Sequence, residues 1–307
     1  MRFFLGIDGG GSKTRCLLGD ERAELGSGSA GACNVVRVGE ACAQSSLEAA
    51  IHEACAGAGI SPRDISRTCA GVAGGGRAEI ERALHHIIAG IVAGEIEIVG
   101  DMEIAHEAAF GGKPGLIVIA GTGSLAFGKN ARGETLRAGG WGRVISDDGS
   151  GHWIGVEAIR AALRARDRGE KTQLLENLVD GFGAESVEEL IIKANGDPMP
   201  DFAAMFPVVL AAAESGDEVA VNTLDRAGHQ LATTAETVLR RLFNSDDVSV
   251  AVHGGVLTTA DRVRKSFMGE LHARCPQTKV ISLTVDPALG ALRRARVGSV
   301  LRIAERT

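Results

Sequence analysis

Two short glycine-rich turns, each preceded by an apolar run, are the first candidates for chemistry in this sequence. The first turn reads GGGSKT and the second GTGS. Consecutive glycines leave backbone N–H groups open to a ligand, and such a nest of amides binds phosphate oxygens. The residues that would do so are Gly9, Gly10, Gly11, Ser12, Lys13, Thr14, Gly121, Thr122 and Gly123. Two ordinary hairpin turns are the alternative interpretation.

Neither turn has the pattern of the two best-known nucleotide-binding loops. The Walker pattern fails because Ser12 separates Gly11 from Lys13. The dinucleotide pattern must open a helix, whereas the turn at Gly121 leads into a second strand-like run that ends in another turn. We therefore expect two strand–turn–strand hairpins that together hold one polyphosphate.

Two aspartates stand at the ends of predicted strands, where a carboxylate can meet a ligand. Asp8 directly precedes the first glycine turn, and a carboxylate there can hold Mg²⁺ beside phosphates, usually through water. Asp101 follows the strand-like run Glu95–Gly100 and begins a helical segment. It could cap that helix, or it could accept a proton during phosphoryl transfer. Ala120 precedes the second turn, so the two turns are not equivalent.

A second group of residues has the chemistry to bind a sugar. Asn34 offers amide donors and an acceptor for hydroxyl groups, although an ordinary turn residue would look the same. Trp141 lies between glycines, where it could stack on a sugar face, brace the loop or pack in a core. Asp147 and Asp148 precede a helix that either of them could cap. Gly74, in a run of three glycines, could line the same site.

The hydrophobic pattern predicts two halves of related topology. The first half has the order strand, strand, strand, helix, strand, helix, strand, helix, and the strand–glycine turn–strand pattern then repeats near residue 120. The expected lobes are residues 1–112 and 113–290, with a helical insertion in the second lobe at about 150–243. A C-terminal helix at about 291–307 is a candidate to pack back on the first lobe.

Composition and charge exclude several classes of protein. The net charge is −6 and no lysine and arginine cluster forms a basic stripe, so nucleic acid is not an expected partner. No apolar run approaches the roughly 20 residues that span a bilayer, and no signal peptide is visible. We therefore expect a cytoplasmic protein with no membrane partner. Six cysteines without a C-x-x-C pair or zinc-ligand spacing predict buried, reduced thiols.

Four sequence blocks in order resemble the actin/hexokinase/heat-shock-chaperone ATPase superfamily. Ile7–Thr14 and Ile119–Ser124 resemble its two phosphate motifs, and Ala251–Val256 resembles its adenosine motif through Gly254 and Gly255. The fourth block, GGWGRVISDDGSGHWIG, is similar to the sugar-kinase members. Within the superfamily the chain resembles, nearly end to end, the group of N-acetylglucosamine kinases and BadF/BadG/BcrA/BcrD ATPases.

This resemblance implies an α/β fold of two ribonuclease H-like lobes, each a mixed five-stranded sheet flanked by helices, with an active-site cleft between them. It implies an ATP- and Mg²⁺-dependent kinase that phosphorylates the 6-hydroxyl of N-acetylglucosamine. The implied partners are a small-molecule sugar and a possible homodimer. The implied roles are catalytic base for Asp101, metal ligand for Asp8, and sugar binding for Asn34, Gly74, Trp141, Gly142 and Asp147. The roles of Asp148 and His253 stay open.

Three alternative functions also stay open at this point. Glucosamine could be the preferred sugar of a kinase of the same family. An ATPase that activates a radical dehydratase or reductase would need cysteines for a [4Fe–4S] cluster, and only Cys69 and Cys275 follow residue 55. A non-catalytic sugar sensor would not need Asp8 and Asp101, yet both are present.

Overall fold

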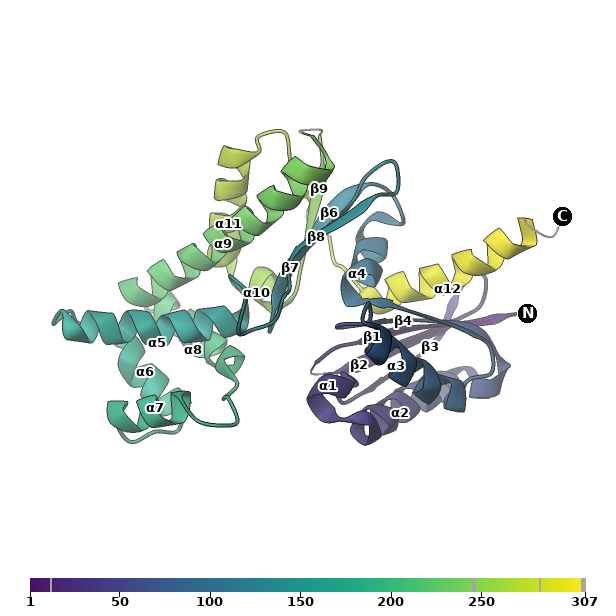
Figure 1. Ribbon diagram of the computed structural model, residues 1–307, viewed down its shortest axis with the longest axis horizontal. Coiled ribbons are helices and arrows are strands. Elements are labelled where there is room, and N and C mark those ends of the chain that lie inside the picture. Colours follow the sequence, from purple (N-terminus) through teal and green to yellow (C-terminus); the bar gives the residue numbers. More distant parts are fainter. Residues whose placement is uncertain (12, 245–246, 282, 305–307) are drawn as a thin grey trace. The chain divides into compact units, whose positions relative to one another are not determined.

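The computed structural model describes residues 1–11, 13–244, 247–281 and 283–304, and the chain divides into two compact units (Figure 1). Unit 1 comprises Met1–Lys113 together with the C-terminal segment from Thr284, and unit 2 comprises Pro114–Leu283. The chain therefore returns to unit 1 earlier than the expected boundary at residue 290. The last helix, α12 (Pro287–Ala304), lies wholly in unit 1.

Unit 1 contains a mixed five-stranded sheet in the order β3-β2-β1-β4-β5. Strand β1 pairs antiparallel with β2 and parallel with β4, and β4 pairs parallel with β5. The carboxyl ends of β1, β4 and β5 consequently lie along one edge. The five strands are β1 (Phe3–Gly9), β2 (Thr14–Gly19), β3 (Glu24–Ala30), β4 (Ile65–Val72) and β5 (Glu95–Gly100).

Helices cover both faces of this sheet because successive side chains of a strand point to opposite faces. On β1, Leu5 and Ile7 join a core with residues of α2 and α3, whereas Phe4 joins a core with residues of α4 and α12. Gly290 of α12 lies so close to α4 that a Cβ atom would collide with the carbonyl oxygen of Ile104. The other helices are α1 (Val35–Val38), α2 (Glu40–Ala58), α3 (Ala78–Ile91) and α4 (Asp101–Phe110).

Unit 2 repeats this sheet topology with the order β10-β9-β6-β7-β8. Strand β6 pairs antiparallel with β7 and parallel with β9, as β1 does with β2 and β4. The strands are β6 (Gly115–Ala120), β7 (Ser124–Lys129), β8 (Thr135–Gly139), β9 (Ser249–His253) and β10 (Lys279–Ile281). The predicted fold class, two mixed five-stranded sheets flanked by helices, is confirmed.

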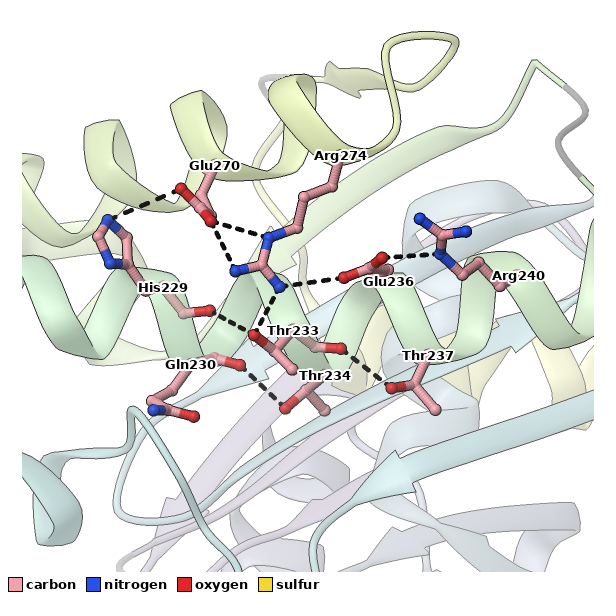
Figure 2. A network of polar contacts seen from close by, with 9 residues as sticks. All are labelled: His229, Gln230, Thr233, Thr234, Glu236, Thr237, Arg240, Glu270 and Arg274. Carbon is pink, nitrogen blue, oxygen red and sulfur yellow. Dashed lines mark hydrogen bonds and ion pairs between the residues drawn. The ribbon is translucent and has the colours of Figure 1, made fainter.

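Between β8 and β9 the chain of unit 2 is helical, and two more helices follow β9. These helices are α5 (Gly151–Asp167), α6 (Leu174–Gly181), α7 (Val187–Ala194), α8 (Phe206–Glu214), α9 (Glu218–Leu242), α10 (Gly255–Thr259) and α11 (Asp261–Arg274). Polar contacts join α9 to α11: Arg274 pairs with Glu236 at 3.0 Å and donates to the Thr233 hydroxyl at 3.0 Å (Figure 2). Within the described residues, no helix is both long and apolar enough to span a bilayer.

Candidate active site

Parallel strand pairing brings the predicted catalytic residues of unit 1 to one edge of its sheet. Gly9 at the end of β1 pairs with Val72 at the end of β4, and Val72 pairs with Gly100 at the end of β5. Asp8, near the end of β1, and Asp101, directly after β5, therefore lie at the same edge of the sheet, with the end of β4 between them. Their electrostatic interaction shows the same proximity, because Asp101 helps to raise the pKa of Asp8.

The first glycine turn is a tight hairpin between β1 and β2. The Gly10 N–H donates to the carbonyl oxygen of Lys13 at 2.9 Å. A Cβ atom on Gly9 would lie 2.6 Å from the Cys33 sulfur, so the backbone has no room for a side chain there. Ser12, which we expected to bind phosphate, lies outside the described residues.

Thr14 is placed differently from its predicted phosphate-binding role. Its side chain is fully buried, and its hydroxyl donates to the carbonyl oxygen of Gly31 at 2.7 Å. The hydroxyl therefore holds the start of β2 against the end of β3 rather than facing a ligand. Its sequence position beside Lys13 gave no sign of this, because burial of a strand residue depends on the strand that packs beside it.

Asp8 is a largely buried carboxylate whose charge is only partly balanced. Burial raises its pKa to about 6, and the carboxylates of Asp101 and Asp286 raise it as well. Lys13 and Arg15 act in the opposite direction. Arg15 is itself engaged by Asp286, with 2.7 Å between Nη1 and Oδ2. A carboxylate in this state would be stabilised by a cation.

These residues fit a magnesium ion that is shared with a nucleotide. The described residues contain no group of three or more acidic, histidine or cysteine side chains that could hold a metal by themselves. Mg²⁺ in phosphoryl-transfer sites is usually held by one or two carboxylates, water and the substrate phosphates. Asp8, next to the glycine turn, meets that requirement.

Asp101 is the first residue of α4 but does not cap it. The N-cap is Gly100, whose N–H donates to the Glu103 carboxylate at 3.2 Å. The Asp101 carboxylate accepts the N–H of Met102 at 2.9 Å, which orients the side chain at the sheet edge. The capping interpretation is therefore wrong for this residue, and its carboxylate is held at the carboxyl end of the sheet.

Asn34 and Gly74 lie in turns of unit 1. The Asn34 side-chain oxygen accepts the N–H groups of Val36 and Arg37 at 3.1 and 3.3 Å and caps the short helix α1. This fixes the amide, so that its NH₂ group is the part left to bind a hydroxyl. Gly74 is exposed and has φ of +81°, a conformation that favours glycine.

In unit 2, the second glycine turn is held by the start of α5. The N–H of Gly151 donates to the carbonyl oxygen of Gly121 at 2.8 Å, and the N–H of His152 donates to that of Thr122 at 3.3 Å. Gly254, at the end of β9, has φ of +93°, and a Cβ atom there would collide with the Ala120 carbonyl oxygen. The ends of β6 and β9 can therefore approach only because this residue is glycine.

The loop after β8 carries the other predicted sugar-binding residues. Trp141 is 61% exposed, and the Arg137 guanidinium lies 4.4 Å from the centre of its ring. Core packing is therefore excluded for this indole, whereas sugar stacking and bracing of the loop both remain. Gly142 has φ of +104°, and its N–H lies near the carboxylate of Asp147.

Asp147 lies beside the second glycine turn. Its Oδ2 would be 2.8 Å from a Cβ atom on Gly123, and its carboxylate lies near the N–H groups of Gly142 and Ser124. Burial nevertheless raises the pKa of Asp147. Neither Asp147 nor Asp148 caps α5, because the Ser150 hydroxyl accepts the N–H of Trp153 at 3.1 Å.

Three charged residues near the first turn were not singled out from the sequence: Arg15, Arg37 and Asp286. Arg15 and Asp286 are far apart in the chain, so only the fold brings them together. Arg37 lies three residues after Asn34, and its Nη1 would be 3.2 Å from a Cβ atom on Gly11. The sequence could have pointed to Arg37, because it lies only three residues after the candidate sugar ligand Asn34.

Comparison with known proteins defines the class of this molecule. A solved structure of a Chromobacterium violaceum protein, proposed to be an N-acetylglucosamine kinase, superposes with a TM-score of 0.75 at 26% identity and covers 95% of this chain and 98% of that one. The N-acetylmuramic acid/N-acetylglucosamine kinase of Clostridium acetobutylicum is 34% identical over 302 residues, which are 96% of this chain and 99% of the relative. The N-acetyl-D-glucosamine kinase of Dictyostelium discoideum is 28% identical over 309 residues, 94% and 96% of the two chains.

These similarities, with the two glycine turns and the aspartate pair, define an ATP-dependent kinase of amino sugars. The pattern of the BadF/BadG/BcrA/BcrD ATPase family matches residues 5–295, so the chain belongs to that family. The predicted family and the predicted enzyme class are confirmed. The relatives named here are kinases, which favours this class over an activator of a radical enzyme.

Proposed function

We propose that this enzyme transfers the terminal phosphoryl group of ATP to the 6-hydroxyl of N-acetylglucosamine. The observation that carries the proposal is the pairing of β1, β4 and β5, which places Asp8 and Asp101 at one sheet edge beside a glycine turn. Phosphoryl transfer needs an oriented nucleophile, a proton acceptor and stabilised phosphate charge, and these residues supply each part.

In unit 1, Asp101 serves as the general base for the acceptor hydroxyl. Its carboxylate is oriented by the Met102 N–H and lies close enough to Asp8 for their charges to interact. Asp8 holds Mg²⁺, which would neutralise phosphate charge when bound. The Asn34 NH₂ group donates to a sugar hydroxyl, since its oxygen is already used to cap α1.

In unit 2, the turn at Gly121–Gly123 presents backbone N–H groups and the exposed Thr122 hydroxyl to phosphates. Gly254 and Gly255 leave the ends of β6 and β9 bare, so that the nucleoside can lie on backbone. Asp147 accepts sugar hydroxyls, and the exposed indole of Trp141 offers a surface on which a pyranose can stack.

The identity of the sugar is the part of this proposal that is tested first. N-acetylglucosamine is preferred because it was expected from the sequence and because both named relatives act on it. N-acetylmuramic acid enters as a candidate through the Clostridium acetobutylicum relative, and glucosamine stays the alternative from the sequence. A cytoplasmic location and a homodimer stay predictions.

The test is Mg²⁺-dependent ADP release with N-acetylglucosamine, N-acetylmuramic acid, glucosamine, N-acetylmannosamine, glucose and no sugar. A rate that depends on an amino sugar supports the proposal, and ³¹P–¹H coupling in the product identifies the phosphorylated carbon. A slow rate that is indifferent to every sugar would overturn it. Iron analysis of the purified protein would then test the activator function directly.

A further inference from the structure

Arg37 lies against the first glycine turn, although it comes from a different element. A Cβ atom built on Gly11 would lie 3.2 Å from Nη1 of Arg37 and 3.8 Å from its Cδ. The hairpin itself does not require this proximity, because its own hydrogen bond joins Gly10 to Lys13. The guanidinium therefore lies beside the amides that we propose to bind phosphate.

The position of Arg37 is set by the same capping interaction that orients Asn34. The Asn34 oxygen accepts the Arg37 N–H at 3.3 Å, so the backbone of Arg37 belongs to the first turn of α1. Asn34 is the N-cap and Arg37 is the third helical residue, so the two are joined directly by the capping hydrogen bond. One short helix thus carries a proposed sugar ligand and a cation that reaches the phosphate turn.

The charges around the turn show why a cation is useful there. Asp8 precedes the turn, and Asp101 and Asp286 lie close enough to raise its pKa. Arg15 is paired with Asp286 at 2.7 Å, and Lys13 acts on Asp8. Arg37 approaches from the side of Gly11, and its side chain is exposed. An exposed guanidinium beside open amides can form charge-assisted hydrogen bonds to phosphate oxygens.

We propose that Arg37 is a catalytic residue that contacts the transferring phosphoryl group of ATP. This inference rests on the proposed function for the assignment of the first turn to phosphate. In the transfer, the acceptor oxygen forms a bond to the terminal phosphorus and the bond from that phosphorus to the bridging oxygen breaks. The acceptor proton passes to Asp101 and ADP leaves, while the guanidinium stabilises the charge on the phosphoryl oxygens.

The first test compares nucleotides with and without the terminal phosphate and needs no sugar. The affinities of the full-length protein for Mg²⁺·AMP-PNP and Mg²⁺·ADP are measured by calorimetry. Arg37→Gln should weaken AMP-PNP binding by about tenfold or more, the expected loss of a hydrogen bond to a charged group, and change ADP binding less than about twofold. The AMP-PNP affinity of Arg37→Lys should lie between those of the wild type and Arg37→Gln, since lysine keeps the charge but not the bidentate geometry. Arg82→Gln, an exposed residue on α3, is the matched control and should change neither affinity.

A second variant displaces the guanidinium without removing it. The Gly11→Ala methyl group would press on Arg37 at 3.2 Å and should reproduce part of the selective loss of AMP-PNP affinity. In turnover with the best acceptor, Arg37→Gln should lower kcat by about 10²-fold. Thermal unfolding of each variant shows whether the lower affinity and kcat result from a less stable fold.

Several results would overturn the inference. If Arg37→Gln loses the same affinity for AMP-PNP and ADP, or loses none for either, Arg37 does not contact the terminal phosphate. A loss confined to an acceptor that carries a carboxylate, such as N-acetylmuramic acid, would assign the guanidinium to the sugar instead. If the wild-type protein phosphorylates no sugar, the proposed function fails, whereas the nucleotide comparison still decides the role of Arg37.

Discussion

Replacement of Asp8 by asparagine should abolish activity and yet stabilise the protein without ligands. Burial and two neighbouring carboxylates raise the pKa of Asp8 from 3.8 to about 6. This difference corresponds to about 3 kcal/mol between the charged and neutral forms in the folded state. Asparagine has the shape of the neutral acid, so at pH 8 the variant should be more stable by up to about 3 kcal/mol.

The sign of the pH dependence follows from proton binding. Between pH 3.8 and about 6 the folded wild-type protein holds a proton on Asp8 that the unfolded chain has lost. The stability contributed by the neutral carboxyl is fully present below pH 3.8 and is lost as the pH rises through about 6. The advantage of Asp8→Asn should therefore be largest at pH 7–8 and disappear near pH 4.

The assay must report on unit 1, where Asp8 lies. Both tryptophans, Trp141 and Trp153, belong to unit 2, so their fluorescence reports on the wrong unit. Four cysteines are buried in unit 1 and become reactive when it unfolds: Cys16, Cys33, Cys55 and Cys69. Thiol labelling along a urea gradient, compared between variant and wild type at the same pH, gives the difference in unfolding free energy.

Added ligand provides a control for this experiment, and two results would contradict the prediction for Asp8→Asn. Added Mg²⁺·ATP should stabilise the wild-type protein more than the variant, because ligand binding to the folded state raises stability and the variant lacks the metal ligand. A variant that is less stable than wild type at pH 8, or a difference that is constant from pH 4 to 8, would show that Asp8 is not an under-compensated carboxylate.

Three further substitutions test separate parts of the site. Asp101→Asn should lower kcat by about 10²–10⁴-fold without loss of nucleotide affinity, and a near-normal rate in the ADP-release assay would remove Asp101 as the base. Thr14→Val should cost about 1–3 kcal/mol in stability, because the Gly31 carbonyl loses its hydroxyl donor; an unchanged melting temperature would contradict this role, and Thr14→Ser is the control that keeps the donor. Trp141→Ala should raise the KM for the sugar while leaving the melting temperature unchanged, since the indole is 61% exposed; a fall in stability with an unchanged KM would assign it to bracing the loop.

Local sequence was sufficient for the turns and for the strand ends beside them. Glycine runs after apolar strands specify tight hairpins whatever surrounds them, and the structure has such hairpins after β1 and β6. The repeated pattern likewise predicted two sheets of the same topology. Capping was harder to predict, because Asp101 and Ser150 both suit a helix start and only the backbone geometry shows that Gly100 and Ser150 are the caps.

The sequence by itself determined which residues could do chemistry, because side-chain type and the bare backbone of a glycine turn are local properties. Only the tertiary structure decided which of these residues are buried, which are paired, and how their pKa values are shifted. Asp286 reaches Arg15 through the return of the chain to unit 1, and the pKa of Asp8 depends on both. Thr14 is buried beside β3, and Arg37 lies near Gly11 because Asn34 caps α1. Burial and charge proximity are sums over contacts between distant segments, and no single stretch of sequence contains them.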